Sequence, residues 1–211
     1  PKCGQPLKWY DMVPVFSWIF LGGKCRNCKE KISARYPIVE SLNAVLWTLS
    51  AYFIGLNANA FIYDALFSAL IVMTFIDIDT KEIPNGIVVF IIILSIPLFF
   101  TAKDVVWWHR LVGAVVISVP LYVIALVTGG IGGGDIKLYF ALGLVLGLYL
   151  TLVSAFIAIV SAGLIGGALL LTKKVKKGYE LPLGPFIALG AVVTVFAGTP
   201  IIDGIKNLFG I

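Results

Sequence analysis

The sequence predicts an all-α polytopic membrane protein: a helical bundle of about seven transmembrane helices preceded by a small segment that contains cysteines. Of the 211 residues, 60% are hydrophobic and the mean hydropathy is +1.02, which excludes an ordinary soluble domain. The apolar stretches also lack the alternation of apolar and polar residues that is typical of membrane barrel strands. Because a spanning backbone must satisfy its own hydrogen bonds, helices are the predicted spanning elements.

Seven segments are apolar enough to be spans, given that a hydrocarbon core of ~30 Å needs about 20 residues per helix. They are predicted at residues 36–56, 59–78, 85–101, 110–128, 135–150, 151–172 and 184–199. This divides the chain into a cytoplasmic cysteine segment, residues 1–35, and a transmembrane domain, residues 36–211.

Basic residues gather on one side of these spans. Of the 16 Lys and Arg residues, seven precede the first span and four lie in the loop before the last, between Lys173 and Lys177. The positive-inside rule makes that side cytoplasmic, so we expect a multi-pass protein of the cytoplasmic (inner) membrane. The net charge of +5 indicates anionic membrane lipid, and no nucleic acid, as a partner. The oligomeric state stays open.

Three cysteines mark the first segment. Cys25 and Cys28 are separated by two residues in "KCRNCKE", and Cys3 in "PKCGQPL" reads like the second half of another such pair. Thiolates are good zinc ligands and a closed structural site takes four, which predicts a structural zinc site with its fourth ligand upstream of Pro1. The segment is therefore expected to be truncated at its start. The alternative is three reduced thiols without a metal.

Acidic residues at span ends are the candidate functional groups. Asp77, Asp79 and Glu82 lie where the second span ends, and Asp135 lies where the fifth begins. The chain crosses the membrane twice between them, so both groups should reach the cytoplasmic side. Asp77 is the most unusual, because the end of the helix and the apolar run "LIVMTFI" before it both disfavour a negative charge.

Two carboxylates brought together in such a place cannot both ionise easily. A pair that shares one proton can act as general base and general acid on a peptide bond, and the glycines before Asp135 let a substrate backbone approach. Alternatives remain at this point. Asp135 can be a helix cap, the acidic residues after Asp77 can be solvated turn residues, or Asp77 and Asp135 can serve a cation- or proton-coupled transporter.

Two motifs resemble those of a known family. Asp77, followed by Ile83-Pro84-Asn85, and "GGGDIKL" around Asp135 are similar to the active-site motifs of type IV prepilin peptidases, which are membrane aspartic proteases of the Gly-x-Gly-Asp group. The cysteine pattern, "ISARYPIVE" and "LPLGPFIALG" extend the resemblance along the chain. Bacterial members typically have eight spans, and a counterpart of their first span is not found in this sequence.

The resemblance implies an aspartic endopeptidase that removes the short basic leader of type IV prepilins or pseudopilins of secretion systems. Cleavage is expected at the cytoplasmic face, after a Gly, with Asp77 and Asp135 as the catalytic pair and no cofactor. Many bacterial members also methylate the new N-terminus with S-adenosylmethionine. The donor site of that reaction is expected before Arg35, with help from the basic loop around Lys173.

The other predicted site residues form two groups. Negative charge near the pair is expected to attract the basic leader, and it comes from Asp79 and Glu82. The predicted active-site loop consists of Gly132, Gly133, Gly134 and Lys137.

Overall fold

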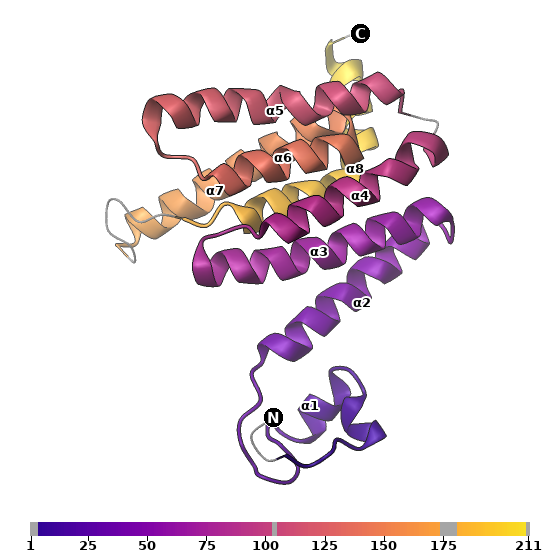
Figure 1. Ribbon diagram of the computed structural model, residues 1–211, viewed down its shortest axis with the longest axis vertical. Coiled ribbons are helices and arrows are strands. Elements are labelled where there is room, and N and C mark those ends of the chain that lie inside the picture. The colour runs from indigo at the N-terminus through magenta and orange to yellow at the C-terminus, as the bar shows by residue number, and fades with distance from the viewer. Residues whose placement is uncertain (1–3, 103–104, 174–180, 210–211) are drawn as a thin grey trace.

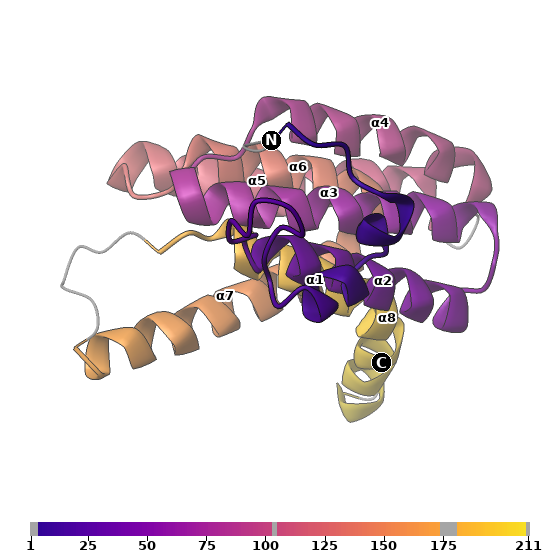
Figure 2. The ribbon, with the colours of Figure 1, turned by 90° about the horizontal axis from the view of Figure 1, so that it is seen from below.

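The computed structural model describes residues 4–102, 105–173 and 181–209, and helices form nearly all of its regular structure (Figure 1). The bundle helices are α2 (Arg35–Phe53), α3 (Ala58–Thr80), α4 (Asn85–Thr101), α5 (Trp107–Thr128), α6 (Gly133–Leu146), α7 (Leu148–Leu171) and α8 (Gly184–Phe209). Helix α6 is central, because α4, α5, α7 and α8 all pack against it. Helix α2 packs on α3 at the edge of the bundle, as Figures 1 and 2 show.

A small unit precedes α2 and lies beside the bundle, next to the first turns of α2 (Figures 1 and 2). It holds a 3-10 helix, η1 (Trp9–Met12), a short helix α1 (Phe16–Phe20), and an antiparallel bridge between Lys24 and Lys31. The guanidinium of Arg26 donates to Asp11 at 2.8 Å and holds the pKa of that carboxyl below its usual range. Among the described residues of this unit only Gly23 is buried, so the unit has no large apolar core.

Each of the seven predicted spans coincides with one helix of the bundle. Within the described residues, four helices are long and apolar enough to cross a membrane by length and composition: α3, α5, α7 and the Gly184–Gly204 part of α8. Helix α4 is apolar but shorter. The protein is thus an all-helical, multi-pass membrane protein, and the full count of seven spans stays a prediction.

The boundary between α6 and α7 differs from the predicted one. The predicted spans met at residues 150 and 151, but α6 ends at Leu146 and α7 begins at Leu148. Gly147 between them has a φ of 77°, a left-handed conformation that glycine adopts without steric cost. With 14 residues, α6 is roughly 21 Å long, which is shorter than the hydrocarbon core. The apolar run through this region contains no polar residue to mark the turn.

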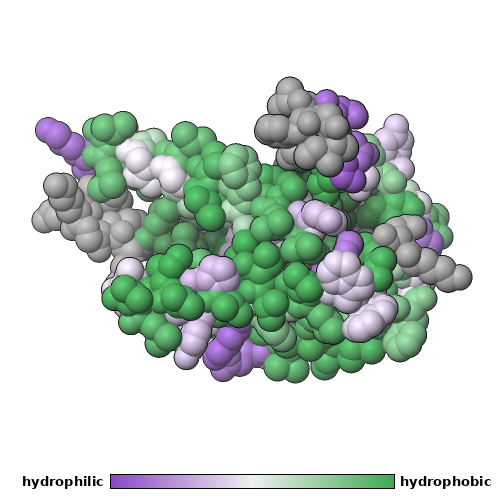
Figure 3. Space-filling view, turned by 90° about the horizontal axis from the view of Figure 1, so that it is seen from above, coloured by the Kyte–Doolittle hydropathy of each residue, from purple (hydrophilic) through white to green (hydrophobic). Residues whose placement is uncertain are grey.

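Outward-facing side chains are apolar over most of the bundle. Figure 3 shows mainly hydrophobic residues on the face over α5, with hydrophilic residues near its margins. Large exposed hydrophobic residues include Phe90, Ile93, Val115, Leu126 and Phe156. In water such a surface would be strongly unfavourable, so it agrees with contact to lipid.

Glycines bring α5 and α6 into close contact. A Cβ atom placed on Gly143 would collide with the backbone of Gly113, and one placed on Gly113 would lie 2.6 Å from the carbonyl carbon of Gly147. Small residues at such crossings let membrane helices approach closely enough to pack backbone against backbone. Gly143 therefore fixes the distance between α5 and the central helix that carries Asp135.

We expect Gly143→Ala to destabilise the fold by about 1–3 kcal/mol, because neither backbone can move without separating the helices. The thermal unfolding midpoint in detergent measures this effect. The matched control is Gly163→Ala in α7, where an added Cβ meets open space. Equal midpoints for the two variants would show that the α5–α6 crossing tolerates a methyl group.

Candidate active site

The end of α3 positions the first predicted carboxylate. Asp77 lies in the last turn of α3 and is 4% exposed. Lys81 then takes a left-handed conformation, with a φ of 56°, and its N–H donates to the carbonyl of Asp77 at 2.8 Å. This cap turns the chain toward Ile83 and Pro84, after which α4 begins. The Asp77 side chain is thereby held inside the bundle.

Asp77 meets the beginning of α8. The backbone N–H of Gly184 donates to Oδ2 of Asp77 at 2.8 Å, and Gly184 is the first residue of α8. The N-terminus of a helix carries a partial positive charge, so it offsets the unfavourable placement of Asp77 at the C-terminal end of α3. A Cβ on residue 184 would lie 2.7 Å from that same oxygen, so only glycine allows this approach.

The second carboxylate is in the first turn of α6. Asp135 is partly buried, and its N–H donates to the carbonyl of Gly132 at 3.1 Å. A Cβ on Gly134 would lie 2.9 Å from Cβ of Ile83, which shows how closely the start of α6 approaches the loop after α3. This contact brings the two acidic motifs together.

One pocket of about 280 Å³ is lined by both carboxylates. The four residues of the predicted active-site loop also line it: Gly132, Gly133, Gly134 and Lys137. The remaining lining residues are Lys81, Glu82, Ile83 and Asn85. The structure thus gathers residues from the α3–α4 loop and the start of α6 around one small, largely polar space. The chemical roles of these residues stay predictions.

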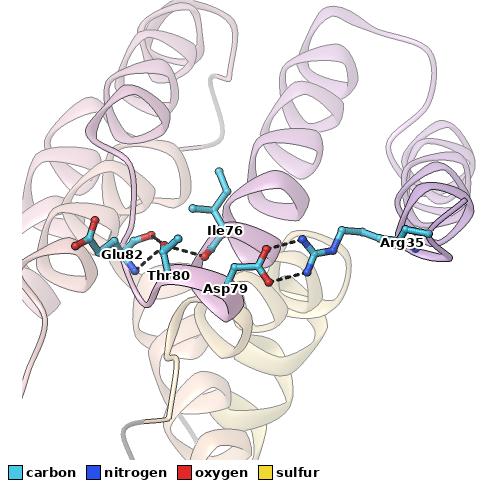
Figure 4. Close-up of polar contacts among 6 residues, drawn as sticks. Arg35, Ile76, Asp79, Thr80 and Glu82 are labelled. Carbon is cyan, nitrogen blue, oxygen red and sulfur yellow. Dashed lines mark hydrogen bonds and ion pairs between the residues drawn. The ribbon is translucent and has the colours of Figure 1, made fainter. Parts of the chain in front are cut away.

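The predicted leader-attracting residues take different positions. The guanidinium of Arg35 donates to both carboxylate oxygens of Asp79, one of them at 2.7 Å, so much of this negative charge is compensated. In Figure 4, Asp79 points toward Arg35 and Glu82 lies on the other side of the turn. Thr80 closes that turn, because its hydroxyl donates to Ile76 and accepts from the N–H of Glu82. Glu82 lines the pocket and Asp79 does not.

The predicted metal ligands are only partly within the described residues. Cys25 and Cys28 lie in one tight turn, where the N–H of Cys25 donates to Glu30 and the N–H of Lys29 donates to Cys25. Cys3 lies outside the described residues. Among all described residues, no three His, Cys, Asp or Glu side chains come together as a potential metal site. Two thiols in one turn suit zinc, and the full ligand set stays a prediction.

Two contributors to the site were not singled out in the sequence analysis. The N–H of Gly184 donates a hydrogen bond to Asp77, which lies 107 residues away in the sequence. The only sequence signal for Gly184 was its position in "LPLGPFIALG". Asn85 accepts a hydrogen bond from Nζ of Lys137 at 3.1 Å, which joins the starts of α4 and α6. The Ile83-Pro84-Asn85 motif contains Asn85, but nothing in its spacing identified this partner.

The fold and the site together define a multi-pass membrane protein that holds two buried or half-buried carboxylates in one pocket near the ends of its helices. Residues 1–54 match the model of the "Bacterial Peptidase A24 N-terminal domain", and residues 65–167 match that of the "Type IV leader peptidase family". The chain belongs to the type IV leader peptidase family and is a membrane peptidase by class.

Several curated relatives cover nearly the whole chain. It is 34% identical to a prepilin leader peptidase/N-methyltransferase from Bacillus subtilis, over 96% of this chain and 82% of that protein. The protein of the same name from Xanthomonas campestris pv. campestris is 31% identical, over 100% of this chain and 76% of the relative. No solved structure matches the chain.

Proposed function

We propose that this protein removes the short basic leader from type IV prepilins or pseudopilins, at the cytoplasmic face of the inner membrane and after a glycine. Asp77 and Asp135 carry out the hydrolysis. The observation that carries this proposal is that both carboxylates line one small pocket, which they share with the glycines before Asp135. The family membership supplies the reaction class, and the names of the relatives supply the substrate class.

The local hydrogen bonds support a different chemical role for each of the two carboxylates. The N–H of Gly184 and the start of α8 favour an ionised Asp77, which then acts as general base on water. The shared proton stays on Asp135, which polarises the scissile carbonyl while the water oxygen attacks its carbon. When the C–N bond breaks, the departing nitrogen takes up a proton from the pair and the leader leaves with a new carboxylate.

The contact between α2 and α3 supports the proposed orientation. Arg35 begins α2 and reaches Asp79 near the end of α3, so the point where the N-terminal segment joins α2 and the carboxylate pocket lie at the same end of the bundle. That segment is basic, and basic segments remain on the cytoplasmic side. At the start of α5, His109 contacts the rings of Trp108 and Tyr149, as expected of an aromatic belt at the opposite interface.

The test is incubation of the purified protein, in liposomes, with a precursor that has a short basic leader ending in Gly and an apolar helix. We expect leader removal on a gel and a cut after the Gly by mass spectrometry. A transporter, the alternative function for the two aspartates, would leave the precursor intact. Intact precursor would overturn the proposed function.

Negative charge at the pocket is expected to attract the basic leader of the precursor. Glu82 lines the pocket, so Glu82→Lys should raise KM for a basic leader about tenfold at low salt and less at high salt, because salt screens the attraction. The control is Asp203→Lys, which changes the net charge equally but lies in the last turns of α8. A KM that does not change with Glu82→Lys or with salt would remove this role.

The methyltransferase activity named for the relatives is a proposal for this chain, with its donor site in the segment before Arg35.

Zinc held by Cys25, Cys28 and Cys3 would stabilise the segment before Arg35, since small metal domains take much of their folding energy from the ion. Metal analysis of the purified protein tests this. We expect about one zinc ion per chain when four ligands are complete, and loss of zinc in the Cys25→Ser, Cys28→Ser double variant. Equal zinc contents in a protein that carries all four ligands and in its double variant would exclude the site.

A further inference from the structure

A groove of about 580 Å³ lies between α4 and α5. Both helices pack against α6 and barely contact each other, so α6 forms the floor of the groove. The walls and floor are mostly apolar, and the main contributors are Val88, Val89 and Ile92 of α4, Val119 and Tyr122 of α5, and Phe140 of α6. Three of these, Val89, Val119 and Tyr122, are about half exposed, so the groove opens toward the surroundings of the bundle.

The groove continues from the carboxylate pocket. Asn85 and Lys137 line both cavities, and Nζ of Lys137 donates to the side-chain oxygen of Asn85 at 3.1 Å. This polar pair stands at the junction, with the charged pocket on one side and the apolar groove on the other. A chain leaving the pocket on this side therefore passes directly into the groove.

The direction of the groove sets which part of a ligand it can take. Helix α4 begins at Asn85, beside the pocket, and Val88 to Ile92 occupy its first two turns. From Asn85 to Ile92 the helix rises roughly 10 Å, toward the end of the bundle that is remote from the carboxylates. An occupant would thus enter from the pocket and run into the depth of the membrane.

We infer that this groove binds the first turns of the apolar helix that follows the scissile bond of the substrate. The inference rests on the proposed function, because it takes the ligand in the pocket to be a precursor with a membrane-inserted helix. Apolar walls open to lipid suit a helix that is itself surrounded by lipid, and the junction places its first residue beside the two carboxylates. A lipid acyl chain suits the apolar walls as well, and the experiment separates the two occupants.

Photo-crosslinking in liposomes tests the groove. The photoreactive residue p-benzoylphenylalanine replaces Val119 in one protein and Ile124 in another, both in an Asp135→Asn background so that precursor is not consumed. Val119 and Ile124 are 52% and 46% exposed, but only Val119 lines the groove, and Ile124 lies about 140° further around α5. The probe is a labelled precursor with a basic leader and an apolar helix of about 20 residues.

We expect the precursor to crosslink at position 119 at least about tenfold more strongly than at position 124, because only position 119 lines the groove. Equal yields at the two positions, or lipid alone crosslinked at position 119, would overturn the groove assignment. Because the crosslinking protein is inactive, this result does not depend on cleavage. Failure of the parent protein to cut the precursor would overturn only the proposed function.

A kinetic comparison covers the case in which the photoreactive residue disturbs α5. Val119→Trp fills the groove in the active protein and should raise KM for the precursor about tenfold, with kcat within about twofold of the parent. Ile124→Trp adds the same side chain outside the groove and should leave both constants near the parental values. A Val119→Trp protein with unchanged KM would show that the substrate helix lies elsewhere.

Discussion

Asp77→Asn and Asp135→Asn are each expected to lower the rate of leader removal by about 10²-fold to 10⁴-fold, the range that acid–base groups contribute. An amide cannot exchange the proton that the pair needs, although an Asn at position 77 can still accept the hydrogen bond from Gly184. Both variants should therefore insert and fold normally. Cleavage of the precursor in liposomes, with the unfolding midpoint measured beside it, checks this prediction.

Asp79→Asn is the matched control for these variants. Asp79 stands two residues after Asp77 but pairs with Arg35 outside the pocket, so its removal should leave substantial activity. An Asp79→Asn protein without activity, together with near-normal cleavage by Asp77→Asn, would identify Asp79 as the catalytic residue instead.

Gly184→Ala is expected to lower kcat about 10²-fold, the effect of displacing a catalytic group by about 1 Å. The added Cβ would lie 2.7 Å from Oδ2 of Asp77 and 2.8 Å from the sulfur of Met73, so the carboxylate must move away from its N–H donor. KM for the precursor should change much less, because the groove and Glu82 are untouched.

Gly167→Ala in α7 is the control for Gly184→Ala, since a Cβ there meets open space. Both variants need an unfolding midpoint near that of the parent, so that a lower kcat reflects the site and not the fold. Parental kcat in a well-folded Gly184→Ala protein would show that the contact between α8 and Asp77 has no part in the chemistry.

Much of the architecture could be predicted from the sequence, because spans follow from apolar length alone. The predicted boundary between α6 and α7 lies a few residues too late, since the turn at Gly147 lies inside a continuous apolar run that has no polar marker. The extension of α8 to Phe209 was also missed, because Pro200 and the polar residues after it resemble a helix end. Hydropathy locates membrane helices well and their ends less well.

The candidate site, like the fold, could be predicted from the sequence only in part. The meeting of Asp77 and Asp135 in one pocket could be predicted, because an even number of crossings returns both motifs to one side of the membrane. The hydrogen bond from Gly184 to Asp77 and the ion pair of Arg35 with Asp79 could not be predicted. Both depend on how helices that are distant in the sequence pack against one another. Residues 77 and 79 lie about 200° apart around α3, so a single helix presents them to different neighbours.

The most direct measurement is the single-turnover rate of leader removal, with protein in excess, for the parent, Asp77→Asn, Asp135→Asn and the double variant. Two residues that act as one unit on one scissile bond give a double variant no slower than the slower single variant. We predict that result, together with the large loss in each single variant. Losses that multiply in the double variant, or a single variant that retains more than about a tenth of the parental rate, would contradict a shared aspartic mechanism.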